Sequence, residues 1–258
     1  MGILNITPDS FYDGGQYKDE SSILEQVDTM RNASATFIDV GGYSSRPGAD
    51  YVSEEEELSR VLPVIRLILK YFPETLISVD TFRSVVAQKS IDAGAAMIND
   101  ISAGFLDENM ITTVGRLGVP YIMMHMKGNP KTMQQHTNYD DLIKDINFYF
   151  ADRIAKAHAE KINDIIIDPG FGFAKTLEQN YELLNKMELL QFTDKPILAG
   201  ISRKSMIYKT LDTTSNKALN GTTALHMVAL QRGAKILRVH DVKEAMECIT
   251  LFNQLTAN

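Results

Sequence analysis

The chain has 258 residues, of which 44% are hydrophobic and 23% charged, and it carries a net charge of −7 at pH 7. These values are ordinary for one globular domain, and the acidic balance argues against a general attraction to nucleic acid or to an anionic membrane. No apolar stretch reaches the ~18 residues that a membrane-spanning helix needs, and no signal peptide is recognisable, so we expect a cytoplasmic protein. The single cysteine, Cys248, cannot form an internal disulfide, and we expect it to be a small buried hydrophobe.

Apolar runs and helical patterns alternate along the whole chain. Strands are predicted near residues 2–6, 36–40, 75–79, 96–99, 119–124, 164–168, 196–199 and 235–239. Helices are predicted over 20–33, 53–71, 83–93, 107–117, 139–161, 178–190, 203–232 (expected to be broken) and 242–256. Ser53, with Glu56 three residues later, indicates a capping box at the start of the second helix.

Strands that alternate with helices pair in parallel through right-handed crossovers. Eight such units favour an α/β fold of one closed (β/α)8 TIM barrel over an open doubly wound sheet, with residues 1–258 forming a single domain. The glycine-rich segments GGYSSRPG and DPGFGF match neither the dinucleotide fingerprint nor the P-loop. No His and Cys residues have the spacing of zinc ligands, and no serine lies in a GxSxG nucleophile elbow.

Six of the apolar runs carry polar residues at or near their C-terminal ends. These residues are Asn5, Asp39, Asp80, Asn99, Asp168 and the pair Arg238 and His240. In a parallel barrel the C-terminal ends of all strands meet at one rim, where barrel enzymes keep their active sites. Each residue alone has a structural alternative, because Asn and Asp start turns and Asp is a favoured helix N-cap. Their repeated placement favours a shared site.

Two loops after the first and second predicted strands are unusually rich in glycine and in functional side chains. TPDSFYDGGQY presents Phe11 and Asp13, and GGYSSRPGADY presents Ser45 and Arg46. Simple turn chemistry would explain the glycines alone. Because loops on a rigid barrel are common places for ligand contact, we expect Asp13 and Arg46 to pair across the two loops and close the site.

An ordered set of motifs now identifies the chain as a member of a known family. MGILNITPDSFYDGG, DVGGYSSRPG, SVDTFRS, IND, MHMKGNPKTMQ, DPGFGFAKT, GISRKS and RVHDV occur in this order. Together they resemble the dihydropteroate synthases. The resemblance implies a (β/α)8 barrel, usually a homodimer and a target of sulfonamides. It also implies condensation of 6-hydroxymethyl-7,8-dihydropterin pyrophosphate with p-aminobenzoate, in the presence of Mg2+, to give 7,8-dihydropteroate and pyrophosphate. Family members usually carry a further segment before MGILN.

The same resemblance implies which residues form the site. The pterin is bound by Asp80, Asn99, Asp168, Phe173, Gly200 and Lys204, with Met123 or Met124 on a face of the ring. p-Aminobenzoate is bound by Phe11, Ser45, Arg46, Pro47 and Ser202. Pyrophosphate is bound by Asn5, Arg238 and His240, and the amide oxygen of Asn5 suits Mg2+. The catalytic set is Asp80, Asp168, Lys204, Asp13 and Arg46. His125 is expected to be a hydrogen-bonded structural histidine.

The implied mechanism is dissociative. Pyrophosphate leaves first, carboxylates stabilise the cation that remains on the pterin methylene, and the aryl amine attacks it. Two alternatives share the pterin pocket: a pterin-dependent methyltransferase that works with a corrinoid protein, and a non-catalytic pterin-binding paralogue. The lysine of GISRKS and the complete TPDSFYDGG loop favour the synthase over the methyltransferase, while two intact loops disfavour the paralogue.

Overall fold

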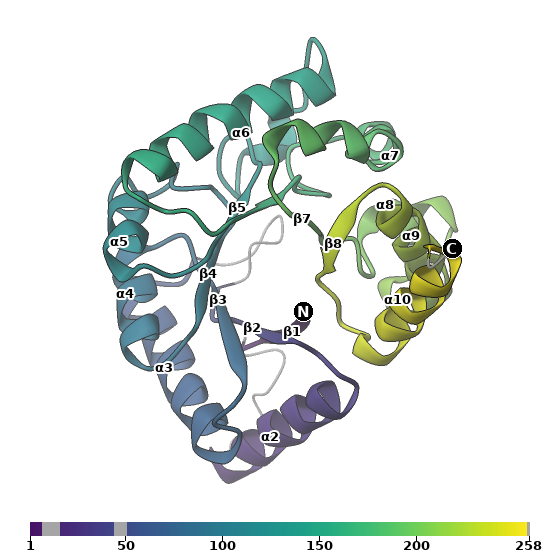
Figure 1. The fold of residues 1–258 in the computed structure, drawn as a ribbon. Helices are drawn as coiled ribbons and strands as arrows, with labels where there is room; N and C mark the ends of the chain where they lie inside the picture. The colour runs from purple at the N-terminus through teal and green to yellow at the C-terminus, as the bar shows by residue number, and fades with distance from the viewer. Residues whose placement is uncertain (7–15, 44–50, 257–258) are drawn as a thin grey trace.

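The computed structural model describes residues 1–6, 16–43 and 51–256 of the chain. Eight parallel strands form one sheet in the order β1 to β8 (Figure 1). Their bounds are β1 Gly2–Asn5, β2 Phe37–Gly41, β3 Leu76–Asp80, β4 Met97–Asp100, β5 Tyr121–Met124, β6 Ile165–Asp168, β7 Ile197–Ala199 and β8 Ala234–Leu237. Each strand lies within one or two residues of its predicted range.

The sheet closes on itself through the segment that follows β8. Gly2 and Val239 form a parallel bridge. The amide of Ile3 donates to the carbonyl of Val239, and the amide of Val239 donates to the carbonyl of Met1, both at 2.9 Å. The predicted (β/α)8 barrel is therefore confirmed.

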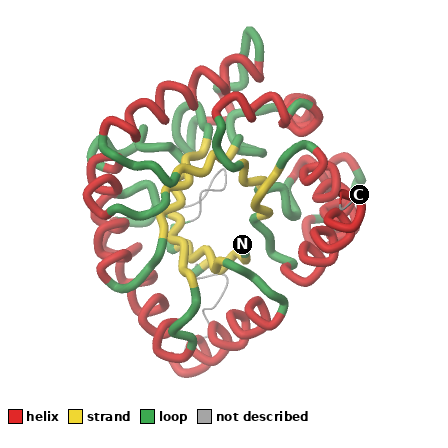
Figure 2. Tube along the Cα trace, viewed as in Figure 1, coloured by secondary structure: helices red, strands yellow, loops and turns green. Residues whose placement is uncertain are grey.

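The helices form an outer ring around the strands (Figure 2). They are α2 Gln16–Asn32, α3 Glu54–Tyr71, α4 Ser84–Asp92, α5 Met110–Leu117, α6 Leu142–Ala159, α7 Leu177–Asn185, α8 Ser205–Thr210, α9 Leu219–Gln231 and α10 Val242–Thr256. Short 3-10 turns are η1 Met133–Gln135, η2 Met187–Thr193 and η3 Ser215–Lys217. The segment predicted to be broken is divided into α8, η3 and α9. Within the described part of the chain, no helix is long and apolar enough to cross a membrane; the cytoplasmic location stays a prediction.

Side chains along each strand alternate between the helices and the barrel interior, as the period of two requires. The residues that face the helices build the main core, among them Ile38, Val79, Ile98, Met123 and Ile167. Cys248 joins this core from α10 and is 2% exposed, as predicted. The residues in alternate positions face inward, where an apolar cluster fills the barrel; it contains Phe37, Met97, Ile122, Ile166, Leu198 and Ile236.

One predicted helix start is only partly correct. The hydroxyl of Ser53 accepts from the amide of Glu56 at 3.2 Å and caps α3, but the reciprocal bond of a capping box does not form. The carboxylate of Glu56 pairs instead with Arg60, one turn later. A complete capping box occurs at α7, between Thr176 and Gln179.

We predict that Gly115→Ala destabilises the barrel although Gly115 lies inside a helix. Alanine gains about 1 kcal/mol of helix propensity over glycine. At this position, however, its Cβ would lie 2.4 Å from the carbonyl oxygen of Glu160 at the end of α6. We expect a net loss of about 1–3 kcal/mol in the free energy of unfolding, measured by urea titration. Thr112→Ala, at an exposed position of the same helix, is the control and should be neutral or slightly stabilising. A stability gain for both variants would contradict the prediction.

Candidate active site

A polar layer lies directly above the apolar filling of the barrel. In seven of the eight strands, the inward position two residues beyond an apolar side chain reaches the C-terminal rim, whereas in β3 the buried Ser78 precedes Asp80 in this pattern. Phe37 is followed in this way by Asp39, and Ile166 by Asp168. The eight positions, one from each strand or directly after it, are Asn5, Asp39, Asp80, Asn99, Met124, Asp168, Gly200 and Arg238. The strand-end residues that the sequence singled out therefore belong to one layer, except His240, which lies two residues beyond Arg238.

Arg238 bonds two of these residues directly and is linked to a third through one of them. Its Nε donates to Oδ2 of Asp39 at 2.6 Å, and its Nη2 donates to Oδ2 of Asp80 at 2.7 Å. The amide nitrogen of Asn99 donates to the same Asp39 oxygen at 3.1 Å. Asp80 does not cap the following helix, because α4 begins after Arg83. The four side chains thus form one hydrogen-bonded group across β2, β3, β4 and the end of β8.

Burial shapes the charges of this group. Burial raises the pKa of Asp80, and the Arg238 guanidinium opposes that rise. Burial also works against the charge on Arg238, but Asp39 and Asp80 outweigh it and raise the pKa of the guanidinium. Arg238 is therefore a permanent cation that favours the ionised form of Asp80 against the effect of burial.

Asp168 and Lys204 form the opposite side of the layer. Oδ1 of Asp168 accepts from the amide of Gly170 at 2.8 Å. A Cβ on Gly200 would lie 3.7 Å from Oδ2 of Asp168 and 3.9 Å from Nζ of Lys204. Since glycine has no such atom, the space between carboxylate and ammonium stays open. Burial raises the pKa of Asp168 against the opposing charge of Lys204, and burial lowers the pKa of Lys204 to about 8 against that of Asp168.

An apolar wall stands beside these polar groups. Met124 packs with Phe173 in a cluster that also contains Ile101, Phe82, Leu106, Met126, Met133 and Ala174. Met123 belongs to the core under the helices instead. Of the two methionines, Met124 is therefore the one beside the polar layer, and its contact with the pterin stays a prediction. The Phe173 ring also lies 4.8 Å from Nζ of Lys204, which in turn donates to the carbonyl of Phe171.

His240 and Asn5 lie at the two ends of the strand order. The Ser202 hydroxyl accepts from the amide of His240 at 3.2 Å and lies 3.2 Å from its Nδ1. Ser202 is 4% exposed and orients His240, and its predicted contact with p-aminobenzoate stays a prediction. Asn5, Gly41 and Asp80 are paired in register across β1, β2 and β3.

The structure adds residues to which the sequence assigned no role. Asp39, noticed only as a strand-end carboxylate, connects Arg238 to Asn99. Lys175 is 3% exposed, and its Nζ lies 3.0 Å from the Gly170 carbonyl, 3.1 Å from the Phe173 carbonyl and 3.0 Å from Nδ1 of His125. His125 is thus buried and hydrogen-bonded, as expected. Lys175 stands in DPGFGFAKT, but nothing in that motif distinguishes an inward lysine from a solvated one.

Several predicted residues lie outside the described part of the chain. They are Phe11, Asp13, Ser45, Arg46 and Pro47. Their roles and the pairing of Asp13 with Arg46 stay predictions.

The arrangement suits a planar polar ligand with an anionic substituent. Asp80 and Asp168 accept hydrogen bonds, Lys204 donates, and Asn99 can do either. Met124 and Phe173 supply apolar contact. Arg238 and His240 offer donors to an anion. Among the described residues, no group of three or more His, Cys, Asp or Glu side chains could hold a metal ion.

Comparison with known proteins gives a consistent result. A family model described as "Pterin binding enzyme" matches residues 1–240. The dihydropteroate synthase of Escherichia coli strain K12 is 45% identical over 251 residues, which are 96% of this chain and 88% of that protein. The structure of Yersinia pestis dihydropteroate synthase with a sulfonamide drug complex superposes with a TM-score of 0.93 at 42% identity, covering 100% of this chain and 94% of that one.

A third relative, Xanthomonas albilineans dihydropteroate synthase with 4-aminobenzoic acid, has a TM-score of 0.92 at 36% identity, with 100% and 92% coverage. Identity at this level extends over nearly the whole length of each relative. The chain belongs to the pterin-binding enzyme family, among the dihydropteroate synthases.

Proposed function

We propose that the chain condenses 6-hydroxymethyl-7,8-dihydropterin pyrophosphate with p-aminobenzoate to give 7,8-dihydropteroate and pyrophosphate. The observation that carries this proposal is the division of the rim into two parts. Asp168, Lys204 and Asn99 offer acceptors and donors to a heterocycle, while Arg238 and His240 offer donors to an anion. Family membership among the synthases also favours this reaction over the corrinoid-linked methyl transfer.

In their ionised form, Asp80 and Asp168 would supply the negative charge that a dissociative reaction needs. As pyrophosphate leaves, positive charge develops on the pterin and its methylene carbon. Asp80 and Asp168 would stabilise that charge in a site with little water, where electrostatic effects are strong. Arg238 would stabilise the negative charge that develops on the leaving group. This division needs no nucleophilic side chain, and none is assigned here.

For Mg2+, the residues present fit a weakly held ion. Mg2+ keeps several waters and takes few protein ligands when it is bound with a phosphate substrate. The amide oxygen of Asn5 is a suitable ligand. Even a Cβ on the neighbouring Gly41 would lie 3.7 Å from that oxygen, so the absence of a side chain there leaves space beside it. When bound, the ion would neutralise charge on the pyrophosphate. Asn5 would hold it, with Arg238 and His240 completing the anion site.

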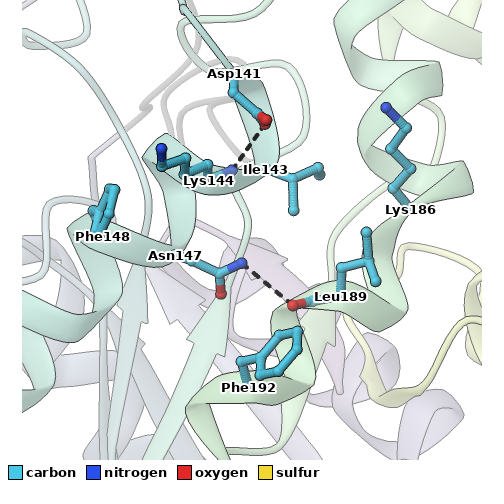
Figure 3. Close-up of a pocket in the computed structure, with 8 residues that line it drawn as sticks. All are labelled: Asp141, Ile143, Lys144, Asn147, Phe148, Lys186, Leu189 and Phe192. Carbon is cyan, nitrogen blue, oxygen red and sulfur yellow. Dashed lines mark hydrogen bonds between the residues drawn. The ribbon is translucent and has the colours of Figure 1, made fainter.

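We also propose that the protein is a homodimer. An apolar groove of about 390 Å3 lies on the outer face of α6 and η2, on the helix ring outside the barrel (Figure 3). Phe148, Leu189 and Phe192 line it and are 65%, 43% and 87% exposed. Asp141 lies in the same groove as Lys144 and Lys186, so a second copy would bring opposite charges to the patch. Exposed apolar side chains gathered in this way mark interaction sites.

The direct test of the function is release of pyrophosphate in a coupled assay. Release should require both the pterin pyrophosphate and p-aminobenzoate. Release that continues without p-aminobenzoate, or none with both substrates present, would contradict the proposal.

We predict that Asp168→Asn weakens pterin binding by about 1–3 kcal/mol, because a buried donor of the ligand would meet a poorer acceptor. Isothermal calorimetry with the pterin alcohol measures the loss. Asp164→Asn is the matched control, since Asp164 is exposed and precedes the same strand at the opposite end of the barrel. Equal affinities for parent and Asp168→Asn would exclude the assigned contact.

His240→Ala is predicted to separate anion recognition from pterin recognition. The variant should weaken binding of the pterin pyrophosphate by about tenfold or more while the pterin alcohol binds nearly as before. Arg238→Ala should weaken binding of both ligands, because Arg238 also holds the carboxylate of Asp80. Calorimetry with the two ligands compares the variants. Loss of both ligands in His240→Ala would assign His240 to the pterin or to the fold.

For the homodimer, we predict that Phe192→Glu converts the protein to a monomer, because a charge would be buried without a partner in the interface. Light scattering after size-exclusion chromatography measures the mass. Leu255→Glu, at a position of α10 that is 68% exposed, should leave the dimer intact. A dimer that survives Phe192→Glu together with Phe148→Glu would place the interface elsewhere.

A further inference from the structure

Arg203 lies in a backbone conformation that is costly for an arginine. Its φ angle is +53°, in the left-handed region that favours glycine. Lys204, the next residue, returns to an extended conformation at the start of α8. Local backbone strain of this kind persists only where surrounding contacts hold it. The contacts of Arg203 must therefore stabilise this conformation.

The guanidinium of Arg203 joins three segments. Its Nε and Nη2 donate to the two carboxylate oxygens of Asp241 at 2.7 and 2.8 Å, a bidentate pair. Its Nη1 donates to the carbonyls of Ser215 and Asn216 at 3.1 and 2.8 Å. The backbone amide of Arg203 donates to the hydroxyl of Thr222 at 3.0 Å. Both partners of the ion pair are about one-fifth exposed, so solvent screens it only in part.

Two of the three joined segments are arms of the candidate site. The first arm follows β7 and carries Ser202 and Lys204 beside Arg203. The second follows β8 and carries Arg238 and His240 before Asp241. A second link between the same arms joins the Ser202 hydroxyl to His240. Arg203 thus connects the arm that carries Lys204 to the arm that carries Arg238 and His240.

We propose that Arg203 is a positioning residue that sets the distance between the pterin subsite and the pyrophosphate subsite. The inference rests on the proposed function, because it assigns Lys204 to the pterin and His240 to the pyrophosphate. Arg203 itself touches neither ligand. A ligand that contains both the pterin and the pyrophosphate needs the two arms at one fixed distance. The pterin alone, or pyrophosphate alone, can bind to the residues of its own arm. The ion pair of Arg203 with Asp241, here called the clamp, therefore matters most for binding of the pterin pyrophosphate and for its reaction.

Arg203→Gly tests this directly. Glycine fits the left-handed backbone without strain, so the variant removes the ion pair with Asp241 without straining the folded backbone. We expect affinity for the pterin pyrophosphate to fall about tenfold or more, with kcat reduced as well, while the pterin alcohol and free pyrophosphate each stay within about threefold. Calorimetry measures all three ligands. Because Arg203 and Asp241 form one clamp, Asp241→Ala and the double variant should show the same loss as Arg203→Gly.

Arg232→Ala is the matched control. It removes another arginine ion pair, to Glu188 at 2.7 Å, at the opposite end of the barrel, before β8. The three affinities should not change in this variant. An equal loss of all three ligands in Arg203→Gly, or no loss of any, would overturn the proposal. Should the glycine variant fold poorly, Arg203→Lys, which keeps the charge but not the bidentate fork, answers the same question.

A second measurement separates this proposal from the proposed function. If the parent chain bound no pterin, the proposed function would fail and the clamp would be judged by hydrogen exchange alone. Amides of residues 201–205 and 239–241 should exchange about tenfold faster in Arg203→Gly than in the parent. Unchanged exchange would overturn the clamp.

Discussion

The double ion pair of Arg238 is the interaction on which the rest of the site depends. Asp39 is fully buried and Asp80 nearly so, and an unpaired carboxylate in such a place costs several kcal/mol. One guanidinium offsets both, because its fork reaches Asp39 through Nε and Asp80 through Nη2. Asn99 is then oriented by its bond to Asp39. Two buried carboxylates can therefore lie close together at this rim, each paired with the same guanidinium.

The alternation of side chains along the strands separates the residues that stabilise the fold from the residues that form the site. In each strand the outward residues hold the helices, while the inward residues first fill the barrel and then, two positions later, form the site. Ile166 and Asp168 show the transition within one strand. A polar substitution one layer lower would meet the filling of Met97, Ile122 and Leu198. The charged side chains therefore lie above that filling, toward the C-terminal ends of the strands.

Most of the fold and part of the site could be predicted from the sequence, and the difference has a physical cause. Strand and helix periods are local, so the eight strands and the broken segment at α8, η3 and α9 were predictable. Polar strand ends identified the rim, including Asp80 and Asp168. Partner choice is not local. That Ser202 bonds His240, 38 residues later in the chain, depends on where folded side chains meet. For the same reason Lys175 and Arg203 gave no signal beyond their place in a motif.

The two neighbours of Asp168 show how the loops complete what the strands begin. Lys204 approaches from the segment after β7, and Lys175 from the segment after β6. Burial lowers the pKa of Lys175 to about 7, which makes its charge expensive. Its ammonium nevertheless has three donors and three acceptors within 3.1 Å. Two of those acceptors are the carbonyls of Gly170 and Phe173. The amide of Gly170 donates to Asp168, and Phe173 provides the aromatic ring beside the site. A buried lysine thus fixes the loop that holds both the carboxylate and the ring in place.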